Sequence, residues 1–163
     1  MLDSIVICIH NVASPQRLID LAKVVFGLGD MNVLVASRIT GMAAQTGVPE
    51  VMRYAYKLRK SFLVFPSLQD AIDLLKPDEV LLLVPEGFPE AESLNSRTTQ
   101  ATQDKRLLLV ISGSEDGFTR ADLGLGDAVY LPGVKEFLPS VALVAIALWI
   151  LRQSLRQPRR DLF

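Results

Sequence analysis

The sequence predicts an α/β protein with a mostly parallel open sheet and helices on both faces. Short apolar runs of strand length recur along the 163 residues, and stretches with helical periodicity separate them. These connections are long enough for crossovers between parallel strands. Two runs, VLLLV at 80–84 and LLLVI at 107–111, lack the alternation of a half-exposed strand, which predicts strands covered on both faces.

Strands and helices are expected to alternate in order. The first helix has a clear start, because Ser14 can act as N-cap and Pro15 suits the first helical position. Residues 85–105 have little apolar periodicity, so we expect a mobile loop with room for one short helix. Strands are expected at 4–9, 33–36, 62–65, 79–84, 107–111 and 127–131, and helices at 15–26, about 50–60, 68–75 and 140–157.

Composition excludes several classes of protein. The net charge of −1 provides no global basic field, so any contact with nucleic acid must be local. The only cysteine, Cys8, and the only histidine, His10, exclude a disulfide framework and most zinc sites, so no metal is expected. The most apolar segment, 141–151, is too short to span a bilayer, and the N-terminus lacks a secretory pattern. We therefore expect a cytoplasmic protein.

The last third of the chain carries a recognisable order of motifs. A glycine–glutamate loop at 113–117 follows an apolar strand, a second strand ends in Leu131-Pro132-Gly133, and Phe137-Leu138-Pro139-Ser140-Val141 leads into a long helix. This order resembles the C-terminal half of the SPOUT methyltransferases, SpoU branch. The glycine loop is one residue shorter than in that family, and Pro139 stands in or near the place of its asparagine.

The resemblance implies a single SPOUT-like domain over residues 1–163. Its parts would be a Rossmann-like half at 1–84, the mobile loop at 85–105, a half tied in a deep trefoil knot at 106–157, and a tail at 158–163. It also implies an S-adenosylmethionine-dependent RNA methyltransferase that acts on tRNA or rRNA, with a ribose 2′-hydroxyl as the preferred acceptor. The protein would be a homodimer without a metal or a membrane segment.

The resemblance also assigns roles to residues. Asn11, Arg17 and Glu115 would be catalytic, with the arginine stabilising a developing alkoxide. Alignment on Phe26-Gly27 would instead place the arginine position at Leu21. The cofactor would lie among three loops, in contact with Val84, Pro85, Gly113, Ser114, Gly117, Leu131, Pro132, Gly133, Phe137 and Leu138.

Other interpretations stay open at this point. The main alternative is a catalytically silent SPOUT-like homodimer that binds RNA, a nucleotide or a protein. A nuclease or phosphatase on a Rossmann-like sheet ranks last, because it would need clustered acidic metal ligands. A basic strip of Arg53, Lys57 and Lys60 beside Tyr54 and Tyr56 favours a solvated helix face over an RNA contact. Trp149 is expected in the core or at a dimer interface.

Overall fold

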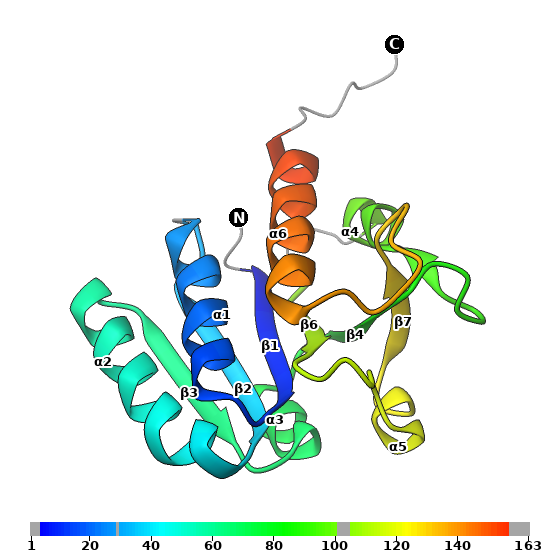
Figure 1. Ribbon diagram of the computed structural model, residues 1–163. Helices are drawn as coiled ribbons and strands as arrows, with labels where there is room; N and C mark the ends of the chain where they lie inside the picture. Colours follow the sequence, from blue (N-terminus) through cyan, green and yellow to red (C-terminus); the bar gives the residue numbers. More distant parts are fainter. Residues whose placement is uncertain (1–3, 29, 101–104, 157–163) are drawn as a thin grey trace.

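The sheet has seven strands, and every neighbouring pair is parallel. In the computed structural model, which describes residues 4–28, 30–100 and 105–156, the strand order is β3-β2-β1-β6-β4-β7-β5 (Figure 1). Sequential strands are therefore not always neighbours, and β6 lies between β1 and β4. The strands are β1 (Ile5–Val12), β2 (Val33–Ile39), β3 (Ser61–Phe65), β4 (Glu79–Val84), β5 (Glu92–Ser93), β6 (Leu107–Ser112) and β7 (Asp127–Tyr130).

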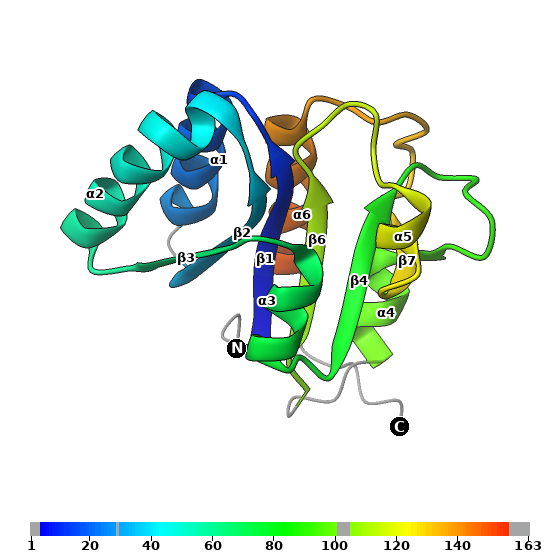
Figure 2. The same ribbon diagram turned by 90° about the horizontal axis from the view of Figure 1, so that it is seen from below.

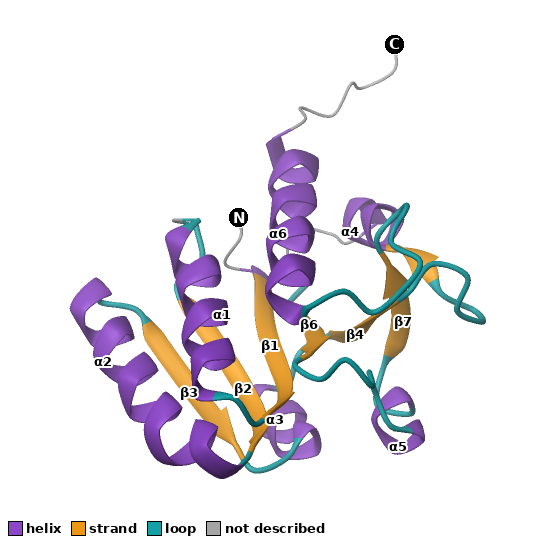
Figure 3. Ribbon diagram, viewed as in Figure 1, coloured by secondary structure: helices purple, strands orange, loops and turns teal. Residues whose placement is uncertain are grey.

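Helices cover both faces of the sheet. The helical elements are α1 (Pro15–Gly27), the π-helical turn η2 (Ala43–Gly47), α2 (Val48–Leu58), α3 (Leu68–Leu75), α4 (Leu94–Gln100), α5 (Arg120–Leu123) and α6 (Ser140–Arg156). Helices α1, α2 and α6 pack on one face, whereas α3 and α5 lie on the other (Figures 2 and 3).

The central strand β6 divides the core into two layers. All six of its residues are buried, and their side chains alternate between the faces. Leu109 belongs to the larger cluster with Leu21 of α1 and Val144 of α6, whereas Leu108 belongs to the smaller cluster with Leu68 of α3. Burial on both faces explains why this segment is a continuous apolar run.

The predicted α/β class with a parallel sheet is confirmed, and each predicted strand is present. Within 85–105, the one short helix that the sequence allowed is present as α4, with Leu94 only 1% exposed, and the two-residue strand β5 was not predicted. The mobility of this segment stays a prediction. Residues 101–104 and the tail at 158–163 lie outside the described residues. The core placement of Trp149 is also wrong, since its side chain is 57% exposed on α6. The knot stays a prediction.

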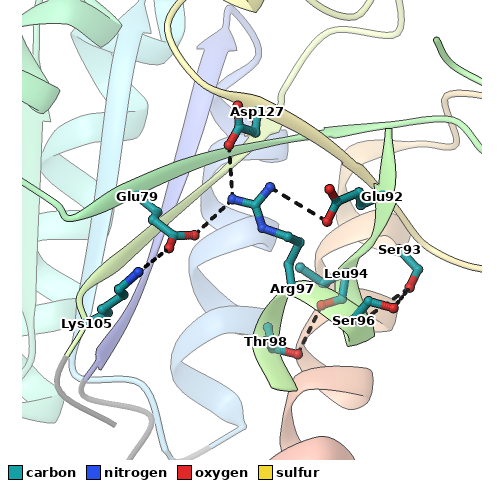
Figure 4. Close-up of polar contacts among 9 residues, drawn as sticks. All are labelled: Glu79, Glu92, Ser93, Leu94, Ser96, Arg97, Thr98, Lys105 and Asp127. Atoms are coloured by element: carbon teal, nitrogen blue, oxygen red, sulfur yellow. Dashed lines mark hydrogen bonds and ion pairs between the residues drawn. The ribbon is translucent and has the colours of Figure 1, made fainter. Parts of the chain in front are cut away.

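An ion-pair network holds α4 against the sheet (Figure 4). Arg97 of α4 donates from Nη2 to Glu79 Oε2 of β4 and to Asp127 Oδ2 of β7, each at 3.0 Å. Its Nη1 lies 3.9 Å from Glu92 Oε2 of β5, and Lys105 Nζ donates to Glu79 Oε1 at 3.0 Å. The hydrogen bond from Arg97 is the main cause of the lowered pKa of Glu79. Arg97 therefore joins one helix to three strands.

Replacing Arg97 with methionine should lower the free energy of unfolding by about 1.5–3 kcal/mol, since its charge-assisted hydrogen bonds to Glu79 and Asp127 are lost, although Glu79 keeps Lys105. Methionine keeps most of the apolar stem. Arg53→Met is the matched control: this side chain is 66% exposed and pairs with Glu50 within one helix at 3.2 Å, so the loss should stay near 0.5 kcal/mol. Chemical denaturation measures both variants, and equal losses would contradict a stabilising role for the network.

Candidate active site at the carboxyl edge of the sheet

Two strained residues mark the edge at which β1 and β2 end. Asn11 has φ 67° and Arg38 has φ 51°, both in the left-handed region that non-glycine residues seldom adopt. The register pairs His10 with Ser37 and Val12 with Ile39, which places Asn11 beside Arg38. Such strain often accumulates at functional sites, and open parallel sheets bind ligands beyond the carboxyl ends of their strands. This edge is therefore the first place to look for a site.

Arg17 reaches the same edge from the first turn of α1. The Ser14 side chain caps that helix by accepting from the Arg17 backbone N–H at 3.3 Å. The Arg17 guanidinium donates from Nη1 to the Gly113 carbonyl oxygen at 2.8 Å, which fixes its position against the loop after β6. Leu21, the other position considered for the arginine, is fully buried in the core and is not available to a ligand.

Gly113 allows the backbone of this loop to approach β1 closely. A Cβ at this position would lie 2.3 Å from Val12 Cγ2 and 2.8 Å from the Asn11 carbonyl oxygen. The Gly113 N–H donates to the His10 carbonyl oxygen at 2.7 Å. Only glycine fits this contact without displacement of its neighbours. The Gly113 loop is thereby fixed against the end of β1, and Arg17 is bonded to the same loop.

The two arginines are cations without a carboxylate partner. Arg17 is half-buried and Arg38 is exposed, and neither forms an ion pair with any residue that the structure describes. Guanidinium groups bind phosphate and carboxylate oxygens through paired hydrogen bonds. An edge with two such groups, one on α1 and one at the end of β2, is suited to an oxyanion such as a phosphodiester.

Behind this edge lies a buried polar group centred on His10. Its Nδ1 is 2.8 Å from the Ser37 hydroxyl, and its Nε2 is 3.3 Å from Asp122 Oδ2. The second contact is electrostatic rather than a well-aligned hydrogen bond, because the Nε2 atom has no partner of good geometry. Burial lowers the pKa of His10, the Arg38 cation lowers it further, and Asp122 opposes both. Burial would raise the pKa of Asp122, but hydrogen bonds from Thr119 and the proximity of His10 outweigh it, so the pKa is lowered.

The lowered pKa of His10 predicts acid-sensitive stability. The unfolded chain takes up a proton near the ordinary value of 6.5, whereas the folded protein does so only at lower pH. Above pH 6.5, neutral His10 therefore contributes to the free energy of unfolding. This contribution is lost as the pH falls through the pKa of His10 in the folded protein. Between about pH 7.5 and about pH 5.5, the wild type should lose more free energy of unfolding than His10→Gln, which has no titrating ring. Parallel curves for the two proteins would contradict the prediction.

The structure brings together the three loops that the sequence predicts. The loop after β4 meets the loop after β7, since Glu86 N–H donates to the Val134 carbonyl at 2.7 Å and Gly133 N–H donates to Glu86 Oε2 at 2.9 Å. The loop after β6 meets the same β7 loop, because a Cβ on Gly117 would lie 2.6 Å from the Phe137 ring. Gly117 has φ +74°, as a glycine turn allows. The loops thus contact one another directly.

The predicted site residues fall into three groups. Asn11, Arg17 and Gly113 lie together at the β1–β6 edge. The residues assigned to the cofactor lie along the three contacting loops, where Val84 and Leu131 are buried. Glu115 is exposed in the turn, and no hydrogen bond or ion pair joins its side chain to the others among the described residues. The roles assigned to all of these residues stay predictions.

Sequence reasoning missed Arg38, His10 and Asp122 as members of this site. From the sequence alone, Arg38 has no assigned role at this edge, and His10 is considered only as a zinc ligand. Polar residues immediately after buried strand positions are the signal that could have found the first two. Asp122 depends on the short helix α5, which the sequence pattern does not predict.

The donor set does not favour a bound metal. Across 4–28, 30–100 and 105–156, no three His, Cys, Asp or Glu side chains gather so that they could hold a metal ion. Among the same residues, no helix is both long and apolar enough to cross a membrane.

Solved structures place the fold among methyltransferases. A structure from Bordetella pertussis Tohama I described as a methyltransferase matches 93% of this chain and 94% of its own, with a TM-score of 0.69 and 17% identity. The SpoU methyltransferase AviRb from Streptomyces viridochromogenes matches 93% of this chain and 60% of its own, with a TM-score of 0.66 and 17% identity. At such identities the likeness shows the fold alone, and the predicted SPOUT-type architecture is supported to that extent.

Sequence relatives define the family, and they point elsewhere. Residues 41–150 match the family model described as RecB-family nuclease (DUF2122), so the chain belongs to this family. One relative, ApeKORF2002P from Aeropyrum pernix, has a name that proposes a type II restriction enzyme. It is 38% identical over 143 residues, which cover 88% of this chain and 89% of the relative. MjaORF1200P from Methanocaldococcus jannaschii, named in the same way, is 31% identical over 88% of this chain and 92% of its own length.

The predicted function is therefore wrong. The family and both relatives point to a nuclease and not to an S-adenosylmethionine-dependent RNA methyltransferase. The resemblance rested on the order of elements in the last third of the chain. That order indicates the fold but not the reaction, because one fold can host unrelated chemistries. The SpoU resemblance holds for the architecture only, and the nuclease interpretation that ranked last from sequence is the one the family supports.

Proposed function

We propose that this protein is a nuclease that hydrolyses phosphodiester bonds of nucleic acid at the edge formed by β1, β2 and the Gly113 loop. Membership of a family of RecB-family nucleases supports the reaction class. The observation that carries the assignment of the site is the pair Arg17, in the first turn of α1, and Arg38, at the end of β2, two guanidinium groups that form no ion pair within the described part of the chain.

The chemistry requires stabilisation of negative charge. Water attacks phosphorus, the bond from phosphorus to the leaving oxygen breaks, and that oxygen takes up a proton. Charge on the non-bridging oxygens rises on the way to the transition state, and fixed guanidinium groups lower its energy. Arg17 is held in place by its bond to the Gly113 carbonyl at 2.8 Å. The Asn11 backbone carbonyl lies against the same Gly113, so Asn11 belongs to the same edge.

His10 acts as a positioning residue in this scheme. Its side chain is 3% exposed, so it does not touch a substrate. Its contacts with Ser37 and Asp122 join the ends of β1 and β2 to the segment that contains α5. This arrangement supports the strained backbone at Asn11 and Arg38. Since no group of acidic ligands lies among the described residues, no step is assigned to a metal ion.

Two expectations from the sequence remain beside this proposal. S-adenosylmethionine binding among the three loops stays a prediction. Dimerisation stays a prediction as well. RNA remains one of the possible substrates. Because the names of the two relatives propose restriction enzymes, DNA is included in the cleavage assay as well.

The proposal is tested by cleavage assays on defined substrates. Purified protein would be incubated with supercoiled plasmid, labelled single-stranded DNA and labelled RNA, each with Mg²⁺ and with a chelator. The double variant Arg17→Gln/Arg38→Gln, purified in the same way, controls for contaminating nucleases. Wild-type cleavage that the double variant lacks would support the proposal. No cleavage of any substrate, or equal cleavage by both proteins, would overturn it.

A further inference from the structure

A second basic surface lies away from the candidate active site, along α2. One hollow of about 310 Å³ lies between α1 and α2 and is lined by Lys23, Arg53, Tyr54 and Lys57 among others. A second hollow of about 500 Å³ continues past the end of α2, where Lys57 is joined by Tyr56 and Arg59. Because Lys57 lines both, we treat them as one surface and call it the α2 groove.

Charge is concentrated in the α2 groove. It contains five cations, Lys23, Arg53, Lys57, Arg59 and Lys60, against the single carboxylate of Glu50, on a chain whose net charge is −1. Glu50 pairs with Arg53 at 3.2 Å. Lys60 is engaged, since its Nζ donates to the Met31 carbonyl and lies 5.7 Å from the centre of the Phe26 ring.

The remaining cations have no such partners. Lys23, Lys57 and Arg59 are exposed, and none forms an ion pair within the described part of the chain. Arg53 and Lys57 are four residues apart on one helix, so their stems lie about 5–6 Å apart. This spacing suits successive phosphates of an extended strand. A solvated helix face of ordinary composition would instead mix cations with carboxylates.

An aromatic side chain completes the α2 groove. Tyr56 is 85% exposed, although a tyrosine ring usually buries most of its apolar surface. It lies beside Lys57 and Arg59 in the larger hollow. Exposed aromatic rings among cations are typical of surfaces that bind single-stranded nucleic acid, because any unpaired base can stack on the ring. By contrast, Tyr54 packs against Phe26, with ring centres 6.1 Å apart, and is a structural residue.

We propose that the α2 groove binds single-stranded nucleic acid, with Arg53, Lys57 and Arg59 on the phosphates and Tyr56 stacked on a base. The inference rests on the proposed function, since it gives the nuclease a surface that holds its polymer substrate. It adopts the nucleic-acid contact that ranked below a solvated helix face from the sequence alone. Helix α2 follows η2 after the end of β2, so it starts near the carboxyl edge of the sheet and runs beside α1 away from it (Figure 1). Residues of α1 and α2 line the first hollow.

The test is equilibrium binding of a fluorescein-labelled 20-nucleotide single strand, measured by anisotropy in the presence of a chelator and across a salt series. The double variant Arg53→Gln/Lys57→Gln should bind about tenfold more weakly, and its salt slope should fall by about 1.4, at 0.7 per lost contact. Tyr56→Ala should lower affinity for the single strand by about tenfold while leaving the salt slope and duplex binding nearly unchanged.

Lys76→Gln is the matched control, because Lys76 follows α3, which lies on the opposite face of the sheet. This variant should bind the single strand as the wild type does. Unchanged affinity for the single strand in both α2 variants would overturn the proposal. So would variants that lose binding only to anionic phospholipid vesicles, titrated in parallel. The assay is independent of cleavage: a protein that binds through α2 but cuts nothing would contradict the proposed function alone. Thermal melting confirms that each variant is folded.

Discussion

Replacing Arg17 with glutamine should lower kcat/KM for nucleic acid cleavage about 100-fold or more. Removal of one fixed donor to a developing oxyanion typically costs on the order of 10² to 10³ in rate. Arg17 is well placed for such a role because its Nη1 bond to the Gly113 carbonyl, at 2.8 Å, fixes the group before substrate arrives. The effect should fall on kcat more than on KM, because the added charge appears in the transition state.

A second variant separates charge from geometry. Arg17→Lys keeps the positive charge but loses the planar fork, so it should recover only part of the lost rate. Removing the bond to Gly113 leaves that carbonyl without its partner, at a stability cost of about 1 kcal/mol, which denaturation measures separately. The proposal predicts that cleavage falls far more than stability does. Full activity in Arg17→Gln would remove this residue from the site.

Much of the architecture could be predicted from local pattern alone. Buried parallel strands such as β6 are continuous apolar runs, and Ser14 with Pro15 marks the start of α1 as the structure has it. The segment at 85–105 could not be predicted in this way. Helix α4 is held by Leu94 in the core and by Arg97, whose partners lie 18 and 30 residues away in sequence. Long-range pairs of this kind leave no periodic signal.

The candidate site was only partly predictable, for a related reason. The family resemblance assigned Asn11 and Arg17 to catalysis and Gly113 to cofactor contact, and the structure brings the three together at one edge, where loops at the ends of parallel strands meet. The left-handed φ of Arg38 and the contact of His10 with Asp122 depend on register and on α5, neither of which the sequence pattern provides. The chemistry was not predictable from the fold at all. A SPOUT-like order of elements is shared with structures described as methyltransferases, while the matching family model is described as a nuclease family and the names of the two relatives propose restriction enzymes.

Gly113→Ala should be among the most damaging single-methyl substitutions in this protein, with a loss of about 1–3 kcal/mol in the free energy of unfolding. The added Cβ would lie 2.3 Å from Val12 Cγ2 and 2.8 Å from the Asn11 carbonyl oxygen. The second contact is with backbone, which cannot rotate away. The loop must therefore move, and the Gly113 carbonyl that holds Arg17 moves with it.

Gly27→Ala isolates this effect from the general cost of replacing glycine. Gly27 is the last residue of α1, and nothing lies within 4 Å of the place its Cβ would take, so the change should be neutral or slightly stabilising. If Gly113 matters only through packing, its variant loses stability and keeps its rate at temperatures where it is folded. If it sets the position of Arg17, cleavage falls at those same temperatures. Equal stability of the two variants would mean that the loop and β1 are not held as closely as the structure shows.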